Sequence, residues 1–209
     1  MNEKILKAVD DYYTEKLNEF GVTPQGVDWN SFESQGLRFE MLSEFIDFKN
    51  KFSILDYGCG FGAMYEYYKD KVGLDFSYNG FDISNSMINE AKKKYKDVTN
   101  VNWFNKLDTN LSYDYVVASG IFNVRQEVSD DSWLDYIFKT LSQINQISIK
   151  GFSFNLLTKY SDKDYMKDYL YYADPLVIFD YCKKNFSKYV SLKHDYPLYE
   201  FTIIVRKDV

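Results

Sequence analysis

The stretch Ile54-Leu55-Asp56-Tyr57-Gly58-Cys59-Gly60-Phe61-Gly62 decides how this chain of 209 residues folds. Its first two residues end an apolar run that begins at Phe52, which predicts a short buried strand. Three alternate glycines follow, and a helical pattern then runs over residues 63–71. A strand that turns through glycines into a helix lets the main chain approach a ligand closely and aims free N–H groups at it. The alternative is a tight strand–helix turn that holds no ligand.

An acidic residue downstream favours a ligand site. Asp82 ends a second apolar run, about twenty residues after the glycines, where an acid that binds ribose hydroxyls is expected. The dinucleotide fingerprint G-x-G-x-x-G would need glycine at the position of Ala63. The spacing here is G-x-G-x-G instead, with Asp56 before its first glycine. Together these features resemble motif I of class I S-adenosylmethionine (SAM) dependent methyltransferases.

Composition limits the other function classes. The chain has 25 Lys and Arg against 31 Asp and Glu and no long basic run, which argues against nucleic acid as a substrate but leaves a local basic patch open. Its two cysteines, Cys59 and Cys182, and its single histidine, His194, match no common metal site. We see no signal peptide and no apolar run of roughly 20 residues. We therefore expect a soluble, cytoplasmic protein that binds neither a metal nor a membrane.

Two helices are predicted before the glycine stretch, over residues 3–20 and from about 31 to 48, with Trp29 in the loop between them. They predict an N-terminal helical cap over residues 1–50 and a Rossmann-like core over residues 51–209. The cap either shapes the ligand site or only covers the sheet.

Strand–helix alternation over the core predicts a mostly parallel sheet with helices on both faces. The predicted strands span residues 52–57, 79–83, 99–104, 113–118, 151–157, 188–194 and 199–206. The predicted helices span residues 62–71, 85–96, 130–146 and 175–185. Residues 158–173 form a tyrosine-rich connection of the length that often covers a site. The last two strands must form an antiparallel hairpin, because so short a link cannot hold a parallel crossover.

The resemblance extends over nearly the whole chain, because class I methyltransferases carry a seven-stranded sheet with one antiparallel strand near the C-terminus. Besides the glycine stretch it rests on residues 29–39, 117–123, 152–155, 171–175 and 194–196. These segments are similar to a branch of small bacterial methyltransferases, some tied to surface-polysaccharide metabolism. The resemblance implies a single domain, residues 1–209, that uses SAM as a monomer or homodimer.

The resemblance also implies which residues hold the cofactor. Asp82 would accept hydrogen bonds from both ribose hydroxyls, Asp56 would lie under the amino group, and Arg38 would meet the carboxylate unless it forms a surface salt bridge. Residues 119–120 would lie near the amino end of the methionine part. The full set is Arg38, Asp56, Gly58, Cys59, Gly60, Asp82, Ile83, Asn105, Lys106, Ser119, Gly120 and Phe122.

The methyl acceptor would lie in the crevice outside the carboxyl ends of the strands. A hydroxyl acceptor needs a base within hydrogen-bond reach, and the candidate catalytic residues are His194, Tyr172 and Asn155. A structural hydrogen bond for His194 and lid packing for Tyr172 are the alternatives. The sequence lacks the Pro-Pro-aromatic signature of nucleobase amino-methyltransferases, the acidic cluster that holds a metal in catechol-type enzymes and a cysteine pair suited to cytosine C5. An oxygen or nitrogen atom of a small polar metabolite remains as the acceptor. The alternatives are a non-catalytic SAM-binding regulatory module and, third, a nicotinamide-linked oxidoreductase.

Overall fold

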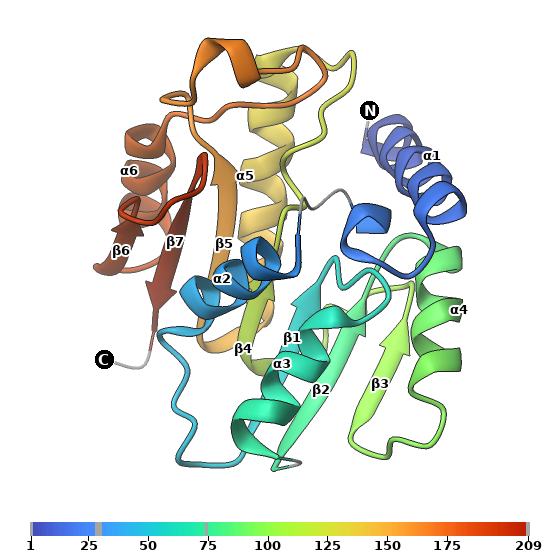
Figure 1. Cartoon of the computed structure of the whole chain (residues 1–209). Coiled ribbons are helices and arrows are strands. Elements are labelled where there is room, and N and C mark those ends of the chain that lie inside the picture. The colour runs from blue at the N-terminus through green and yellow to red at the C-terminus, as the bar shows by residue number, and fades with distance from the viewer. Residues whose placement is uncertain (1, 28–30, 74, 208–209) are drawn as a thin grey trace.

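Seven strands form one sheet in the computed structural model, which describes residues 2–27, 31–73 and 75–207 (Figure 1). Trp29 lies outside these residues. The strands are β1 Phe52–Tyr57, β2 Phe76–Phe81, β3 Val101–Phe104, β4 Tyr113–Ala118, β5 Ser148–Leu157, β6 Tyr189–Lys193 and β7 Glu200–Arg206. Their order is β3-β2-β1-β4-β5-β7-β6. β1 to β5 are parallel, and β7 pairs antiparallel with β5 and β6, so the predicted sheet and C-terminal hairpin are confirmed.

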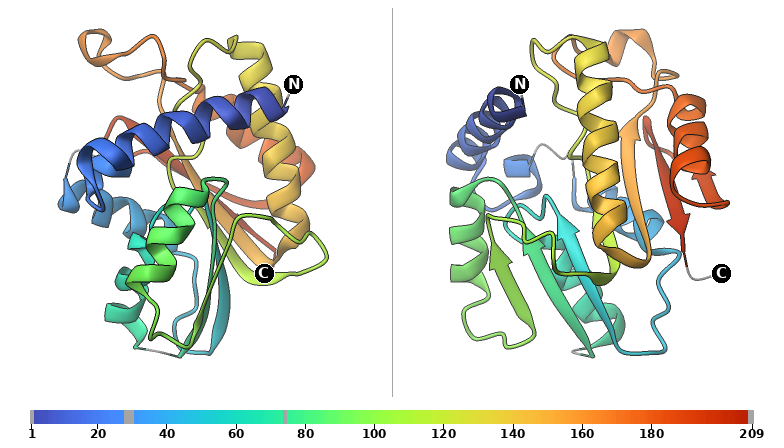
Figure 2. Two further views of the ribbon diagram at one scale, coloured as in Figure 1. Left: turned by 90° about the vertical axis from the view of Figure 1, so that its right-hand side faces the viewer. Right: turned by 180° about the vertical axis from the view of Figure 1, so that it is seen from behind.

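Helices cover both faces of the sheet, as expected. They are α1 Asn2–Phe20, α2 Phe32–Ser43, α3 Ala63–Val72, α4 Asn85–Lys94, α5 Asp130–Ile147 and α6 Pro175–Asn185, with 3-10 turns at Pro24–Val27 and Lys163–Tyr165. α2, α3 and α4 pack on one face and α5 and α6 on the other. α1 lies across the end of the molecule where the parallel strands finish (Figures 1 and 2).

Both faces of the sheet bury aromatic as well as aliphatic side chains. The share of aromatic rings is larger on the face under α2 and α3, which includes Phe52, Tyr68, Phe76 and Tyr78. Phe52 and Phe76 stack with ring centroids 5.7 Å apart. A buried tyrosine needs a hydrogen-bond partner for its hydroxyl. Tyr68 shares one with Ser43 at 2.9 Å, and Tyr78 donates to Asp56.

α2 is shorter than the predicted helix over residues 31–48. Its N-terminus agrees, because Ser31 caps it and accepts the N–H of Ser34 at 3.2 Å. Its last helical residue is Ser43, however, and the chain then turns toward the sheet. The apolar spacing continues past this point because Phe45 packs edge-on against Tyr115, with ring centroids 5.3 Å apart. Burial of side chains in an irregular turn therefore mimics helical periodicity there.

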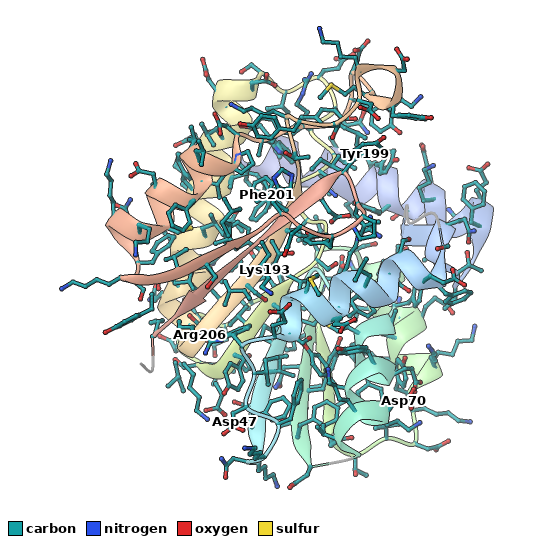
Figure 3. All side chains as sticks on the ribbon, turned by 60° about the vertical axis from the view of Figure 1, so that its left-hand side comes forward. Asp47, Asp70, Lys193, Tyr199, Phe201 and Arg206 are labelled. Atoms are coloured by element: carbon teal, nitrogen blue, oxygen red, sulfur yellow. The ribbon has the colours of Figure 1, made fainter. Side chains whose placement is uncertain are left out.

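The connection over residues 158–173 lies at the same end of the molecule as the carboxyl ends of the parallel strands (Figure 1). The N–H of Tyr171 donates to the carbonyl of Asn123 at 2.8 Å, and the N–H of Thr158 donates to the carbonyl of Tyr199 at 3.0 Å. β7 starts beside this connection, near Tyr199 and Phe201, and runs to Arg206 at the opposite end (Figure 3). Every helix among the described residues is too short or too polar to cross a bilayer.

Candidate cofactor and active site

The glycines after β1 occupy backbone conformations that other residues rarely adopt. Gly58, Gly60 and Gly62 have φ of +83°, +53° and +85°. A Cβ atom at Gly58 would lie 2.2 Å from Cγ2 of Ile121, and one at Gly62 would lie 2.3 Å from the indole ring of Trp103. Both contacts are shorter than carbon atoms tolerate. The turn from β1 into α3 therefore requires glycine, and it leaves bare main chain at its surface.

A carboxylate ties this turn to the end of β2. Asp82 accepts the N–H of Gly60 at 2.8 Å on one oxygen and the N–H of Ser84 at 2.8 Å on the other. The N–H groups of Gly58 and Cys59 both donate to the carbonyl of Phe81, at 2.7 and 2.9 Å. These contacts fix the position of Asp82, and each of its oxygens keeps a second lone pair for a ligand.

Burial shapes the electrostatics of both predicted acids. It raises the pKa of Asp56, which is 2% exposed, to about 7, although the Tyr78 hydroxyl that donates to it opposes the rise. It raises the pKa of Asp82 to about 6, against its two N–H donors, and the charge of Asp10 adds to this rise. A cationic ligand group would lower both values, because it favours the charged form of a carboxylate.

A cavity opens above these residues, and the empty space in it together with its mouth, which is open to solvent, is about 960 Å³. Its floor is the glycine stretch with Asp56 and Asp82, and one wall is residues 119–121 together with Tyr136 of α5. The buried hydroxyl of Ser119 lies in this wall and has no hydrogen-bond partner among the described residues.

The N-terminal helix forms the roof of the cavity. From the sequence alone, this helix could either shape the ligand site or only cover the sheet. Leu6, Val9, Asp10 and Tyr13 of α1 line it. Their spacing of three and four residues places them on one face of a helix. The hydroxyl of Thr14, one residue further on, lies 3.3 Å from that of Ser84, so α1 sits directly over the loop after β2. The apolar face of α1 was visible in the sequence, but what it covers was not.

Comparison with known proteins identifies the family. A family model described as "Methyltransferase domain" matches residues 54–143. "Putative methyltransferase Rv1506c" of Mycobacterium tuberculosis is 48% identical over 156 residues, which are 75% of this chain and 93% of that protein. The chain belongs to the class I SAM-dependent methyltransferase family.

Solved methyltransferase structures share the fold. The DhpI complex with S-adenosylhomocysteine (SAH) aligns with a TM-score of 0.64 and 12% identity over 97% of both chains. A SAM-dependent methyltransferase from Aquifex aeolicus aligns with a TM-score of 0.54 and 15% identity over 82% of this chain and 87% of that one. The chain thus shares the fold of these structures, and SAM is the cofactor that the family implies.

The residues of the cavity fit SAM. Gly58 and Gly60 let a ligand approach the main chain closely, and the start of α3 supplies N–H groups without partners in the helix. Asp82 offers acceptors for vicinal hydroxyls. The unpaired Ser119 hydroxyl adds a donor or acceptor on the opposite wall.

Most of the predicted cofactor residues lie together in this cavity. The eight that line it are Asp56, Gly58, Cys59, Gly60, Asp82, Ile83, Ser119 and Gly120. The other four lie elsewhere. Phe122 is fully buried in the core, Asn105 donates to Asn85 at 2.5 Å, Lys106 is exposed, and Arg38 forms an ion pair with Glu200. Their cofactor contacts remain predictions.

The three predicted catalytic residues are not among the described residues that line the cavity. His194 is exposed and its ring centroid is 5.9 Å from that of Tyr160. The hydroxyl of Tyr172 accepts the N–H of Lys167 at 2.9 Å. Asn155 is buried and hydrogen-bonds to Gly120 and Glu200. A catalytic role for each remains a prediction. Among the described residues no three His, Cys, Asp or Glu side chains gather as a metal site would require.

Proposed function

We propose that this protein transfers the methyl group of SAM to an oxygen or nitrogen atom of a small polar metabolite. One observation carries the proposal: the Asp82 carboxylate is tied to the N–H of Gly60 on the floor of an open cavity. An acid fixed against a glycine turn is the arrangement that an adenosyl ligand needs, because ribose presents two adjacent hydroxyl donors.

The cofactor contacts follow from this placement. Asp82 accepts from the ribose hydroxyls, Ile83 flanks the adenine, and the main chain of residues 58–60 meets the methionine part. Asp56 lies under the amino group, and residues 119–120 close the methionine end. Bound SAM supplies a methyl group on a positive sulfonium. The chain binds and orients the two reactants and excludes water, and such alignment can supply roughly 7–11 kcal/mol.

The acceptor meets a largely apolar wall. Leu6 and Val9 of α1, Ile121 after β4 and Tyr136 of α5 surround the part of the cavity beyond the acids. A small molecule fits this enclosure better than a polymer, and the net charge of −6 disfavours nucleic acid. A cytoplasmic location, a monomeric or homodimeric state and a link to surface-polysaccharide metabolism stay predictions.

A second function, a SAM-binding regulatory module without catalysis, is favoured by one observation. The described residues that line the cavity include no histidine or lysine, and the two acids whose pKa burial raises toward neutral, Asp56 and Asp82, are assigned to the cofactor. This assignment leaves neither of these two acids free to act as a general base toward an acceptor. An acceptor that loses its proton easily would not need one.

Methyl transfer from labelled SAM separates the two functions. The wild-type protein is incubated with SAM carrying an isotopic methyl group and the small-molecule fraction of a bacterial extract. Methyltransferase activity predicts a labelled metabolite that is absent when Asp82→Asn replaces the wild type and present with Asp97→Asn, a change at an exposed position in the turn between α4 and β3. Saturable SAM binding without any labelled product would favour the regulatory module.

A further inference from the structure

Three buried polar side chains from different elements form a continuous set of contacts behind the cavity. Arg38 of α2 forms an ion pair with Glu200 of β7, and Nδ2 of Asn155 in β5 donates to the same carboxylate. Oδ1 of Asn155 accepts the N–H of Gly120 at 2.8 Å. The exposed fractions of Arg38, Asn155 and Glu200 are 7%, 1% and 0%. We call Arg38, Glu200 and Asn155 the buried relay.

Each contact in the buried relay orients the next. A backbone N–H can only donate, so Gly120 requires the amide oxygen of Asn155. The amide nitrogen of Asn155 then donates to Glu200. An ionised carboxylate accepts this hydrogen bond more strongly than a protonated one. Burial raises the pKa of Glu200, and the guanidinium of Arg38 opposes that rise and favours the charged form. Arg38 therefore acts on Gly120 through two intermediates.

The stability of the fold does not account for these buried charges. Replacing a buried ion pair by apolar side chains of similar volume is often neutral or stabilising. A role at the site does account for them, because the relay ends on a residue that lines the cavity. Gly120 has φ of +74° and lies beside Ser119 in the cavity wall. The next part of this segment has its own support, since Nε1 of Trp133 donates to the carbonyl of Phe122 at 2.8 Å.

We propose that the buried relay positions Gly120, and with it Ser119, at the end of the cavity that receives the methionine part of SAM. The inference rests on the proposed function, which places that part of the cofactor against residues 119–120. It makes Arg38 a positioning residue that acts through Glu200 and Asn155, and it links α2 to the cofactor site. Tyr199 and Phe201, which flank Glu200 in the sequence, mark the end of β7 where this link is made (Figure 3).

Two variants break the buried relay without leaving a charge buried alone. The double variant Arg38→Met/Glu200→Leu removes both charges, so we expect a melting temperature equal to or above that of the wild type. Asn155→Ala leaves the ion pair in place and removes the acceptor of the Gly120 N–H. Each should weaken SAH binding about tenfold, the factor that corresponds to about 1.4 kcal/mol for a lost buried hydrogen bond.

A matched control removes a comparable ion pair that does not reach the cavity. Glu44, at the C-terminal end of α2, pairs with Lys193 of β6. This pair also joins α2 to the C-terminal hairpin, but both side chains are about one-third exposed. The variant Glu44→Gln/Lys193→Gln should bind SAH with the wild-type affinity.

The decisive readout compares two ligands. 5′-Methylthioadenosine keeps the adenosine part of SAH but lacks the amino-acid part. Titration calorimetry should give a roughly tenfold loss for SAH in both relay variants and an unchanged affinity for 5′-methylthioadenosine. Equal losses for both ligands would reveal general loosening of the site and overturn the inference, as would an unchanged SAH affinity in folded relay variants. A wild-type protein that binds neither ligand would instead overturn the proposed function and, with it, this inference.

Discussion

The two ends of the cavity are built in different ways. One end, at the glycine turn, uses residues close in sequence: the turn after β1 and Asp82 after β2 meet through a 2.8 Å hydrogen bond across adjacent parallel strands. The other end uses Gly120, which is held by Asn155 and, through it, by Glu200 and Arg38 from distant elements. The first end thus depends on backbone conformation, and the second depends on buried polar side chains. Substitutions at the two ends should fail for different reasons.

The largest effect is expected at the backbone-dependent end. Gly58→Ala forces a left-handed residue to carry a Cβ atom 2.2 Å from Ile121, which must then move into the cavity. We expect at least a hundredfold loss of SAH affinity by calorimetry. Gly73→Ala is the control, since Gly73 also has a positive φ, of +66°, but no atom of the described residues lies within 4 Å of its added Cβ. It should lose about 1–3 kcal/mol of stability and no affinity. Equal losses of SAH affinity in the Gly58 and Gly73 variants would contradict the claim that Gly58 matters because of its place in the cavity.

A second prediction uses the burial of Asp56 beneath the glycine turn. Its pKa in the folded protein, about 7, lies above the ordinary value of 3.8, so the fold favours the protonated form. The wild type should therefore lose stability as the pH rises from 4 to 7, by about 3 kcal/mol from this group alone. Asp56→Asn keeps an acceptor for Tyr78 and should be more stable than the wild type at pH 8 but not at pH 4.

Urea unfolding at the two pH values measures this difference directly. The same variant should bind SAM less tightly, because it lacks the charge under the amino group. An advantage of Asp56→Asn that is the same at pH 4 and pH 8 would mean that Asp56 does not titrate between them.

A smaller effect is expected from the roof, which covers both ends of the cavity. Tyr13→Ala removes an α1 side chain that lines the cavity, and we expect SAH affinity to fall about tenfold, in line with the loss of one partly buried aromatic contact. Glu15→Ala, at an exposed position on the same helix, is the control. α1 should also gain protection from hydrogen exchange when SAH is added. If Tyr13→Ala binds like the wild type, α1 covers the cavity without contacting the ligand.

The smallest effect is expected from a substitution in α2, which tests whether the flexibility of this helix influences SAH binding. Gly36 lies inside α2, and an added Cβ there meets no atom within 4 Å. Gly36→Ala should stabilise the protein by about 0.5–1 kcal/mol, because glycine loses more backbone entropy in a helix than alanine does. Urea unfolding measures the gain, and SAH affinity should not change. A changed affinity would mean that the conformational freedom of α2, and not only the charge of Arg38, matters for the site.

The same division explains what the sequence could predict. The parallel strands, the glycine turn after the first of them and the place of Asp82 at the end of the second follow from local spacing, and they are found as expected. The roof was not predictable, because the apolar face of α1 does not reveal which surface it covers. Arg38 shows the same difficulty, since its ion pair joins positions 38 and 200 and no local pattern connects them. The end of α2 was overestimated because Phe45 continues the apolar spacing outside the helix.

Calorimetric titration of the protein with SAM tests the central claim most directly. The account predicts saturable binding of one SAM per chain in the micromolar range. Asp82→Asn should weaken it about a hundredfold, since two hydroxyl contacts to a charged acceptor are lost, and the exposed control Asp97→Asn should leave it unchanged. No saturable binding by the wild type, or the same affinity in Asp82→Asn, would contradict the assignment of the cavity to SAM.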